Sequence, residues 1–132
     1  MREIKFRAFL NSKYYENPRM LSWEELLEQH NAIDMFQGDL MTLMPYTGLH
    51  DNNGQEIYEC DILKVISEDG ESYVATVKWF GDEGYPAFDL AGIPAAWNYD
   101  ANALATIFQS GVETCEVIGN VFENPELLEA DK

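Results

Sequence analysis

The sequence predicts a mainly β (α+β) protein with two or three short helices. Short runs of β-branched and aromatic residues recur with a period near two, Gly, Pro, Asn and Asp separate these runs, and only a few segments have helical spacing. With 132 residues, 46% of them hydrophobic, the chain suits a single domain over residues 1–132. We find no internal repeat and no Pro/Gly/Ser-rich linker that would indicate a second domain.

The first predicted element is a strand over residues 4–10. Ile4, Phe6, Ala8 and Leu10 alternate with Lys5, Arg7 and Phe9. We expect the first set to face the core and the basic residues to lie on an outer face.

A helix is predicted at about residues 23–31. Ser22 and Glu25 have the spacing of a capping box, and an apolar stripe follows at i, i+3, i+4 and i+7. His30 closes this stripe. We interpret it as a core or boundary histidine, because no second ligand stands at metal spacing beside it.

Residues 40–47 are apolar and contain Pro45, which predicts a strand that ends there or lies at a sheet edge. Asp51-Asn52-Asn53-Gly54 predicts a hairpin or tight loop. We expect Thr47-Gly48 and Asn53-Gly54 to reverse the chain.

A β-meander is predicted next, with strands at residues 62–66 and 73–80, a turn at 68–70 and a fourth strand at 87–90. Tyr73, Ala75, Val77 and Trp79 share one face of the longer strand.

The last third of the chain predicts a short helix that ends before Gly111, a strand over residues 115–122 and a terminal helix. Asn124 and Pro125 are suited to the start of that terminal helix, as N-cap and first helical residue.

The net charge of −16 is the most unusual bulk property. Residues 1–19 hold five basic and two acidic side chains, about +3, while the remainder holds three basic and 22 acidic ones, about −19. Such a field repels phosphate backbones, so direct binding to DNA or RNA is disfavoured. The acidity indicates either a solubilising surface or a mimic of nucleic acid that occupies a basic cleft on a partner.

We predict no catalytic, cofactor-binding or metal-binding residues. Cys60 and His50 flank the predicted turn as a possible nucleophile and base, but the acidic residues around them would raise the thiol pKa. A calcium loop starting at Asp51 would need a bidentate acid at its twelfth position, which is Ile62. Phosphate-loop and zinc spacings are absent from the sequence.

Cys60 and Cys115 stand far apart without a CxxC pair, which indicates two reduced thiols. The N-terminus has no apolar run behind its charges, and no stretch is apolar over the roughly 18 residues that a membrane span needs. We therefore expect a cytoplasmic protein.

Three segments in series resemble the YopX family of phage and prophage proteins: MREIKFRAF (residues 1–9), YTGLHDNNGQEIYECDIL (residues 46–63) and EVIGNVFENPELL (residues 116–128). The resemblance implies a mainly β fold with a small barrel-like antiparallel sheet and helical additions. It implies no reaction, because the family has no assigned activity. The family pattern usually has glycine where this chain has Cys60, so a tight turn there would place a side chain in torsions that glycine tolerates better.

The leading functional hypothesis is a non-catalytic interaction protein that binds a host or phage protein through an acidic or aromatic surface. We also expect a homo-oligomer, because many aromatic and Met side chains occur in a small chain and because the basic first segment could pair with an acidic neighbour. One alternative is the acidic nucleic-acid mimic, and another is a small carboxylate- or metal-dependent hydrolase.

Overall fold

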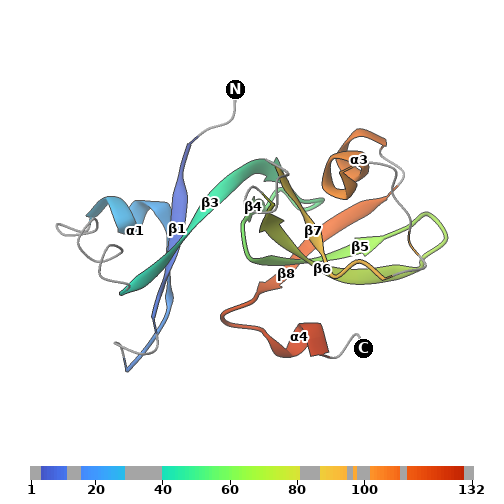
Figure 1. Ribbon diagram of the computed structural model, residues 1–132. Helices are drawn as coiled ribbons and strands as arrows, with labels where there is room; N and C mark the ends of the chain where they lie inside the picture. Colours follow the sequence, from blue (N-terminus) through green and yellow to red (C-terminus); the bar gives the residue numbers. More distant parts are fainter. Residues whose placement is uncertain are drawn as a thin grey trace.

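The computed structural model describes residues 4–11, 16–28, 40–80, 87–94, 97, 102–110 and 113–129. Helices and strands follow one another as shown in Figure 1: β1 (Phe6–Leu10), β2 (Met20–Leu21), α1 (Trp23–Glu28), β3 (Met41–His50), β4 (Glu56–Tyr58), β5 (Asp61–Ile66), β6 (Ser72–Trp79), β7 (Phe88–Ala91), α3 (Ala103–Ser110), β8 (Thr114–Asn120) and α4 (Glu126–Glu129).

The strands form two antiparallel sheets, in the orders β2-β1-β3-β4 and β7-β6-β5-β8, and the second curls into a half-barrel. β1, β2, α1 and the first half of β3 form an arm that projects from the half-barrel (Figure 1). The second half of β3 pairs with β4 beside the half-barrel. The structure therefore confirms a mainly β fold with a half-barrel and short helices.

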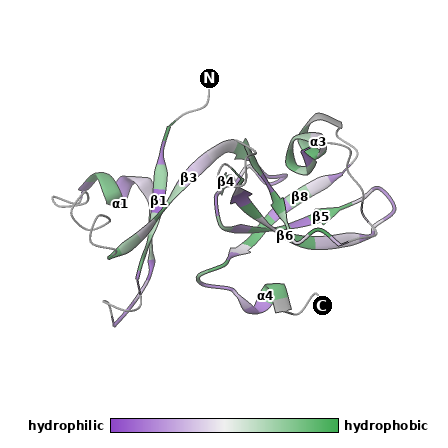
Figure 2. Ribbon diagram, in the orientation of Figure 1, coloured by the Kyte–Doolittle hydropathy of each residue, from purple (hydrophilic) through white to green (hydrophobic). Residues whose placement is uncertain are grey.

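Each part has its own hydrophobic core, and Figure 2 shows hydrophobic residues in both the arm and the half-barrel. The arm core lies between α1 and the sheet and contains Ala8, Leu21, Leu26 and Met41. The larger core lies inside the half-barrel under α3 and contains Ile57, Leu63, Val65, Tyr73, Ala75, Val77, Leu90, Ala103, Leu104, Ile107 and Cys115.

The prediction that the basic residues of the first predicted strand, residues 4–10, lie on an outer face is wrong. Phe6 and Ala8 pack in the arm core, but Lys5 and Arg7 pair with Glu56 and Asp61, and their side chains are only 12% and 13% exposed. One face of β1 packs against α1, and the other meets residues of β4 and β5. Both faces are therefore covered, so the alternation of apolar and basic residues does not distinguish a buried face from a solvent-exposed one.

The helix predicted at residues 23–31 is observed as α1 over its first six residues. Its capping box forms: Glu25 N–H donates to Ser22 Oγ at 3.2 Å, and Ser22 N–H donates to the Glu25 carboxylate at 3.1 Å. His30 lies outside the described residues.

The prediction for the strand containing Pro45 is wrong in its position. β3 is an inner strand, paired with β1 on one side and β4 on the other. Tyr46 N–H donates to the carbonyl of Lys5 on the β1 side, whereas the carbonyl of Pro45 accepts the N–H of Glu59, just beyond the end of β4. The N–H and carbonyl of one strand residue point to the same side, so the N–H that Pro45 lacks would also point past the end of β4. No hydrogen bond of the β3–β4 ladder is therefore lost.

The hairpin predicted at Asp51–Gly54 is confirmed as the turn between β3 and β4. Thr47-Gly48 does not reverse the chain as expected. Gly48 lies inside β3 with φ +90°, where the register with β4 shifts, so it forms a bulge that bends the strand.

The meander is confirmed by β5, β6 and β7, and the later helices and strand by α3, β8 and α4. Gly111 lies outside the described residues. Tyr73, Ala75 and Val77 are buried as the pattern predicts, whereas Trp79 at the end of β6 is 40% exposed.

The chain after β8 is held by side-chain amides. Asn120 Oδ1 accepts the N–H groups of Phe122 and Glu123, and Asn124 Oδ1 accepts Asn120 N–H at 3.2 Å. Phe122 then stacks on Phe9 of the arm, with ring centroids 4.9 Å apart. The C-terminal segment therefore contacts the arm.

None of the helices found in the described part of the chain combines the length and the apolar character needed to cross a membrane.

Candidate functional site

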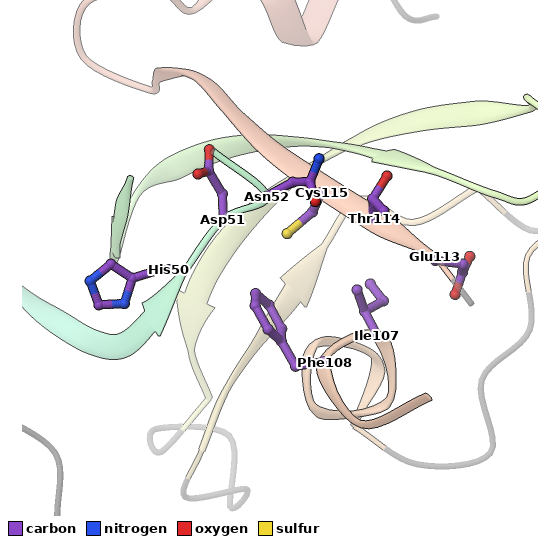
Figure 3. Close-up of a pocket in the computed structure, with 8 residues that line it drawn as sticks. All are labelled: His50, Asp51, Asn52, Ile107, Phe108, Glu113, Thr114 and Cys115. Atoms are coloured by element: carbon purple, nitrogen blue, oxygen red, sulfur yellow. The ribbon is translucent and has the colours of Figure 1, made fainter. Parts of the chain in front are cut away.

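A cavity of about 310 Å³ lies between the β3–β4 turn, β8 and α3 (Figure 3). The end of β3 and the turn contribute one wall, α3 a second and the start of β8 a third. The residues that line it are His50, Asp51, Asn52, Ile107, Phe108, Glu113, Thr114 and Cys115.

Asp51 is the buried carboxylate of this cavity, and it holds the half-barrel together. Its Oδ1 accepts the N–H groups of Asn53 and Gln55, which shapes the turn, and its Oδ2 accepts Val117 N–H of β8 at 2.8 Å. Asn52 N–H donates to the carbonyl of Cys115. The turn thus forms hydrogen bonds with Val117 N–H and the Cys115 carbonyl on the outer edge of β8, where a neighbouring strand would otherwise pair.

These bonds also fix the charge state of Asp51. Burial disfavours the carboxylate, but the N–H groups of Val117, Gln55 and Asn53 stabilise it, so its pKa lies below the ordinary value of 3.8. Asp51 is ionised at neutral pH.

The structure does not join Cys60 and His50 as a nucleophile and base. His50 ring nitrogens lie 3.3 and 3.5 Å from the Tyr46 hydroxyl, and no hydrogen bond links His50 to either thiol among the described residues. Burial, with Asp51 adding to it, raises the pKa of Cys115 to about 11. Burial and Glu59 raise that of Cys60 to about 11. Both cysteines are free, as predicted, and both are protonated at neutral pH.

A second polar cluster, the junction cluster, lies where the arm meets the half-barrel: Lys5, Arg7, Glu56, Tyr58 and Asp61. The Arg7 guanidinium donates to Asp61 Oδ1 at 2.7 Å, and Lys5 pairs with Glu56. Arg7 also lies over the Tyr58 ring, 4.9 Å from its centroid. Tyr58 N–H donates to Asp61 Oδ2 at 2.8 Å, so both oxygens of this carboxylate are engaged.

Burial dominates the acid–base behaviour of the junction cluster. Asp61 is 1% exposed, and burial raises its pKa although Arg7 and Tyr58 N–H oppose the shift. Burial and the Glu56 charge raise the pKa of Tyr58 to about 12. Arg7 Nε is a buried donor for which the described part of the chain offers no hydrogen-bond partner. The cluster therefore fastens the arm to the half-barrel mainly through the largely buried Arg7–Asp61 pair, while Glu56 is 35% exposed.

Two apolar hollows share Phe88 in their linings, and we call the surface that they form together the Phe88 groove. One hollow, of about 290 Å³, is lined by Pro45, Glu59, Trp79 and Phe88. A second, of about 380 Å³, is lined by Thr47, Leu49, Ala87, Phe88, Asn102, Leu104, Ala105 and Phe108.

The aromatic pair of the Phe88 groove stands edge to face, with the centroids of Trp79 and Phe88 5.1 Å apart and the rings 64° from coplanar. Sequence reasoning missed this surface, since periodicity assigned Trp79 to the core-facing side of its strand. The position of Trp79 near the end of its predicted strand, shortly before Gly81, could have indicated an exposed side chain, because strand ends lead into loops at the surface.

Among the residues that the structure describes, no group of three or more His, Cys, Asp or Glu side chains could hold a metal ion. The Asp51–Gly54 segment forms the hydrogen-bonded turn favoured over a calcium loop on the spacing of its acids.

The comparisons with known proteins agree with this architecture. A family model described as YopX protein matches residues 5–129. The SPbeta prophage-derived uncharacterized protein YopX of Bacillus subtilis (strain 168) is 40% identical over 80 residues, which are 60% of this chain and 54% of that protein, so the match spans about half the length of this curated relative.

Protein EF1440 from Enterococcus faecalis, known from a crystal structure, is similar in fold. The two chains superpose with a TM-score of 0.53 at 18% identity, over 97% of this chain and 99% of the other. The family model covers nearly the whole described chain, including the arm, the β3–β4 turn and the segment after β8. This protein belongs to the YopX family.

Proposed function

We propose that this protein is a non-catalytic interaction module of phage or prophage origin, which acts in the cytoplasm and binds a host or phage protein. The Phe88 groove is the observation that carries the proposal. Trp79 is 40% exposed beside an apolar hollow, and Trp and other aromatic side chains contribute most of the binding energy at many protein interfaces. Phe88 and Pro45 give that hollow further apolar surface.

The use of the buried acids supports a non-catalytic role over that of a carboxylate-dependent hydrolase. Both oxygens of Asp51 accept backbone N–H groups, and both oxygens of Asp61 are bonded, to Arg7 and to Tyr58. These carboxylates hold chain segments together and leave little capacity to activate a water molecule.

Self-association is a second part of the proposal. Ile4 and Leu27 of the arm are 72% and 66% exposed, and large apolar side chains at the surface favour association. Lys5 and Arg7 pair within the chain, so the arm's apolar surface gives better support for an oligomer than the basic charge of the first segment does.

Affinity capture from bacterial host lysate tests the proposal, with tagged wild-type protein, Trp79→Ala and a Ser72→Ala control at the exposed far end of β6, each at low and high salt. We expect a protein that wild type and Ser72→Ala retain and Trp79→Ala loses. Equal retention by Trp79→Ala would overturn the role of the groove. Capture of a basic nucleic-acid-binding protein that is released at high salt and does not depend on Trp79 would favour the nucleic-acid mimic. An untagged copy of the chain, added to the lysate and retained, would support self-association.

A further inference from the structure

The Phe88 groove runs along the end strand of its sheet, β7, where an extended peptide could add as a further strand. Phe80 N–H donates to the carbonyl of Ala87, so Ala87 faces β6 with its backbone groups. In an antiparallel pair this direction alternates along the strand, so the N–H and carbonyl groups of Phe88 and Leu90 point away from β6. The outward carbonyl of Phe88 accepts Asn102 Nδ2–H at 2.8 Å, and the outward N–H of Leu90 donates to Asp89 Oδ1 at 2.8 Å. A strand added here would have to break both bonds.

A segment that binds through side chains avoids this conflict. The groove offers the edge-to-face pair of Trp79 and Phe88 with Pro45, and Phe88 divides it into two successive apolar hollows. A polyproline II segment needs no strand partner, since its backbone is solvated, and its proline rings insert between aromatic side chains.

The negative charge of the protein favours basic over acidic segments of this kind. Glu59 lies at the first hollow, and the whole molecule carries a formal charge of −16. A field of this sign accelerates the approach of a cationic segment and repels an acidic one.

We propose that the Phe88 groove binds a proline-containing, basic segment of a protein partner in an extended, polyproline II-like conformation. This inference rests on the proposed function and names the chemistry of the partner. Proline rings would occupy the two hollows on either side of Phe88, and Lys or Arg side chains would lie near Glu59.

A titration of the ¹⁵N-labelled full chain by NMR tests it with three synthetic peptides. The first has a Pro-x-x-Pro core flanked by Arg, the second has Ala in place of Pro, and the third has Glu in place of Arg. We expect the first to shift the Trp79 indole N–H and the Phe88 amide saturably, and the other two to bind at least roughly tenfold more weakly. Trp79→Ala should remove the binding, and Ser72→Ala, at an exposed residue at the opposite end of β6, should preserve it.

The peptide comparison uses wild-type protein, so it stands even where Trp79→Ala fails to fold. Absence of shifts at Trp79 and Phe88 with millimolar peptide, or equal binding of the Ala or Glu peptide, would overturn the inference. If Trp79-dependent capture of a partner persisted in that case, the proposed function would stand and only the partner's chemistry would be wrong. The opposite outcome is that the first peptide binds as expected while Trp79→Ala still captures the same proteins as wild type. The groove would then bind the inferred kind of segment, and the proposed function, capture of a partner through the groove, would be wrong.

Discussion

Cys60 adopts φ +73° in the turn between β4 and β5, a conformation that costs most residues with a side chain about 1–2 kcal/mol. Its backbone holds this turn in place, because its N–H donates to Val77 of β6 and its carbonyl accepts Val121 N–H. The position where the family usually has glycine is therefore a tight turn, and Cys60 occupies it with a strained positive φ.

We therefore predict that Cys60→Gly raises the free energy of unfolding by about 1 kcal/mol, since glycine adopts this torsion without a Cβ clash. Urea denaturation at neutral pH measures the change. Cys60→Ala is the matched control, because it removes the same thiol and keeps the Cβ. Equal stability of the two variants would contradict the prediction.

Asp51 gives a pH prediction at the same scale. Its folded-state pKa is lowered, so the stability it contributes is present above the ordinary pKa of 3.8 and is lost as the pH falls through the folded-state value. Asp51→Asn replaces one carboxylate oxygen, which accepts Val117 N–H or an N–H of the turn, by an NH₂ group that can only donate. We expect this variant to lose about 1–3 kcal/mol of the free energy of unfolding at pH 7.

Between about pH 5 and pH 2, the stability of Asp51→Asn should fall less than that of wild type, because the variant lacks this ionisation. Urea melts across that range measure both slopes. Parallel slopes would show that Asp51 has the same pKa in the folded and unfolded chain.

At the scale of elements, the end of β8 depends on the absence of a side chain. A Cβ added at Gly119 would lie 2.5 Å from Asn124 Oδ1 and 2.9 Å from Asn124 Cβ. Asn124 is itself required there, because it accepts Asn120 N–H and stands directly before the terminal turn and α4.

Gly119→Ala should therefore cost about 1–3 kcal/mol by forcing Asn124 out of place. In an Asn124→Ala background the same substitution should cost less, although Asn124→Ala is itself destabilising. A double-mutant cycle by urea denaturation measures this coupling. Additive losses would mean that the two residues do not compete for space.

For the whole molecule, the decisive contact is the junction between the arm and the half-barrel. Arg7 and Asp61 are separated by 54 positions in the sequence, and they form a largely buried ion pair that Lys5–Glu56 and Phe9–Phe122 accompany. Removing one member of a buried pair leaves an uncompensated charge, whereas removing both can cost far less.

Arg7→Met and Asp61→Asn should each lose about 3–5 kcal/mol, and the double variant should lose clearly less than their sum. The side-chain amide that Asp61→Asn introduces can still accept Tyr58 N–H through its oxygen. Denaturation of the four proteins gives the coupling energy. A coupling near zero would show that the ion pair does not fasten the arm.

Much of the local structure was accessible from the sequence because its causes are local. The capping box at Ser22 and Glu25, the Asp51–Gly54 turn and the meander all rest on neighbouring residues, and the structure contains each of them. Asn124 and Pro125 directly precede α4, but Asn124 Oδ1 accepts the upstream N–H of Asn120 and so does not act as the predicted N-cap. The resemblance to the YopX family added the barrel-like sheet, which no local pattern encodes.

Errors arose where an element has two covered faces or changes partner. Periodicity assigned one face of β1 to solvent, but that face meets β4 and β5, so Lys5 and Arg7 are largely buried. Pro45 was predicted to end a strand or lie at an edge because the sequence does not show that β3 passes from β1 to β4 there. The Phe88 groove was missed for a similar reason, since Pro45 comes from β3, whereas Trp79 and Phe88 are paired on the later strands β6 and β7.

The elements, the reduced thiols, the acidic charge and the family all follow from the amino-acid sequence alone, because they depend on residues near one another or on composition. The roles of Asp51 and Asp61 emerge only in the folded chain, because each depends on contacts with strands far away in the sequence. A carboxylate near a turn has the same local signature whether it binds a ligand or an N–H group of a distant strand. Its function is set by the neighbours that folding brings to it.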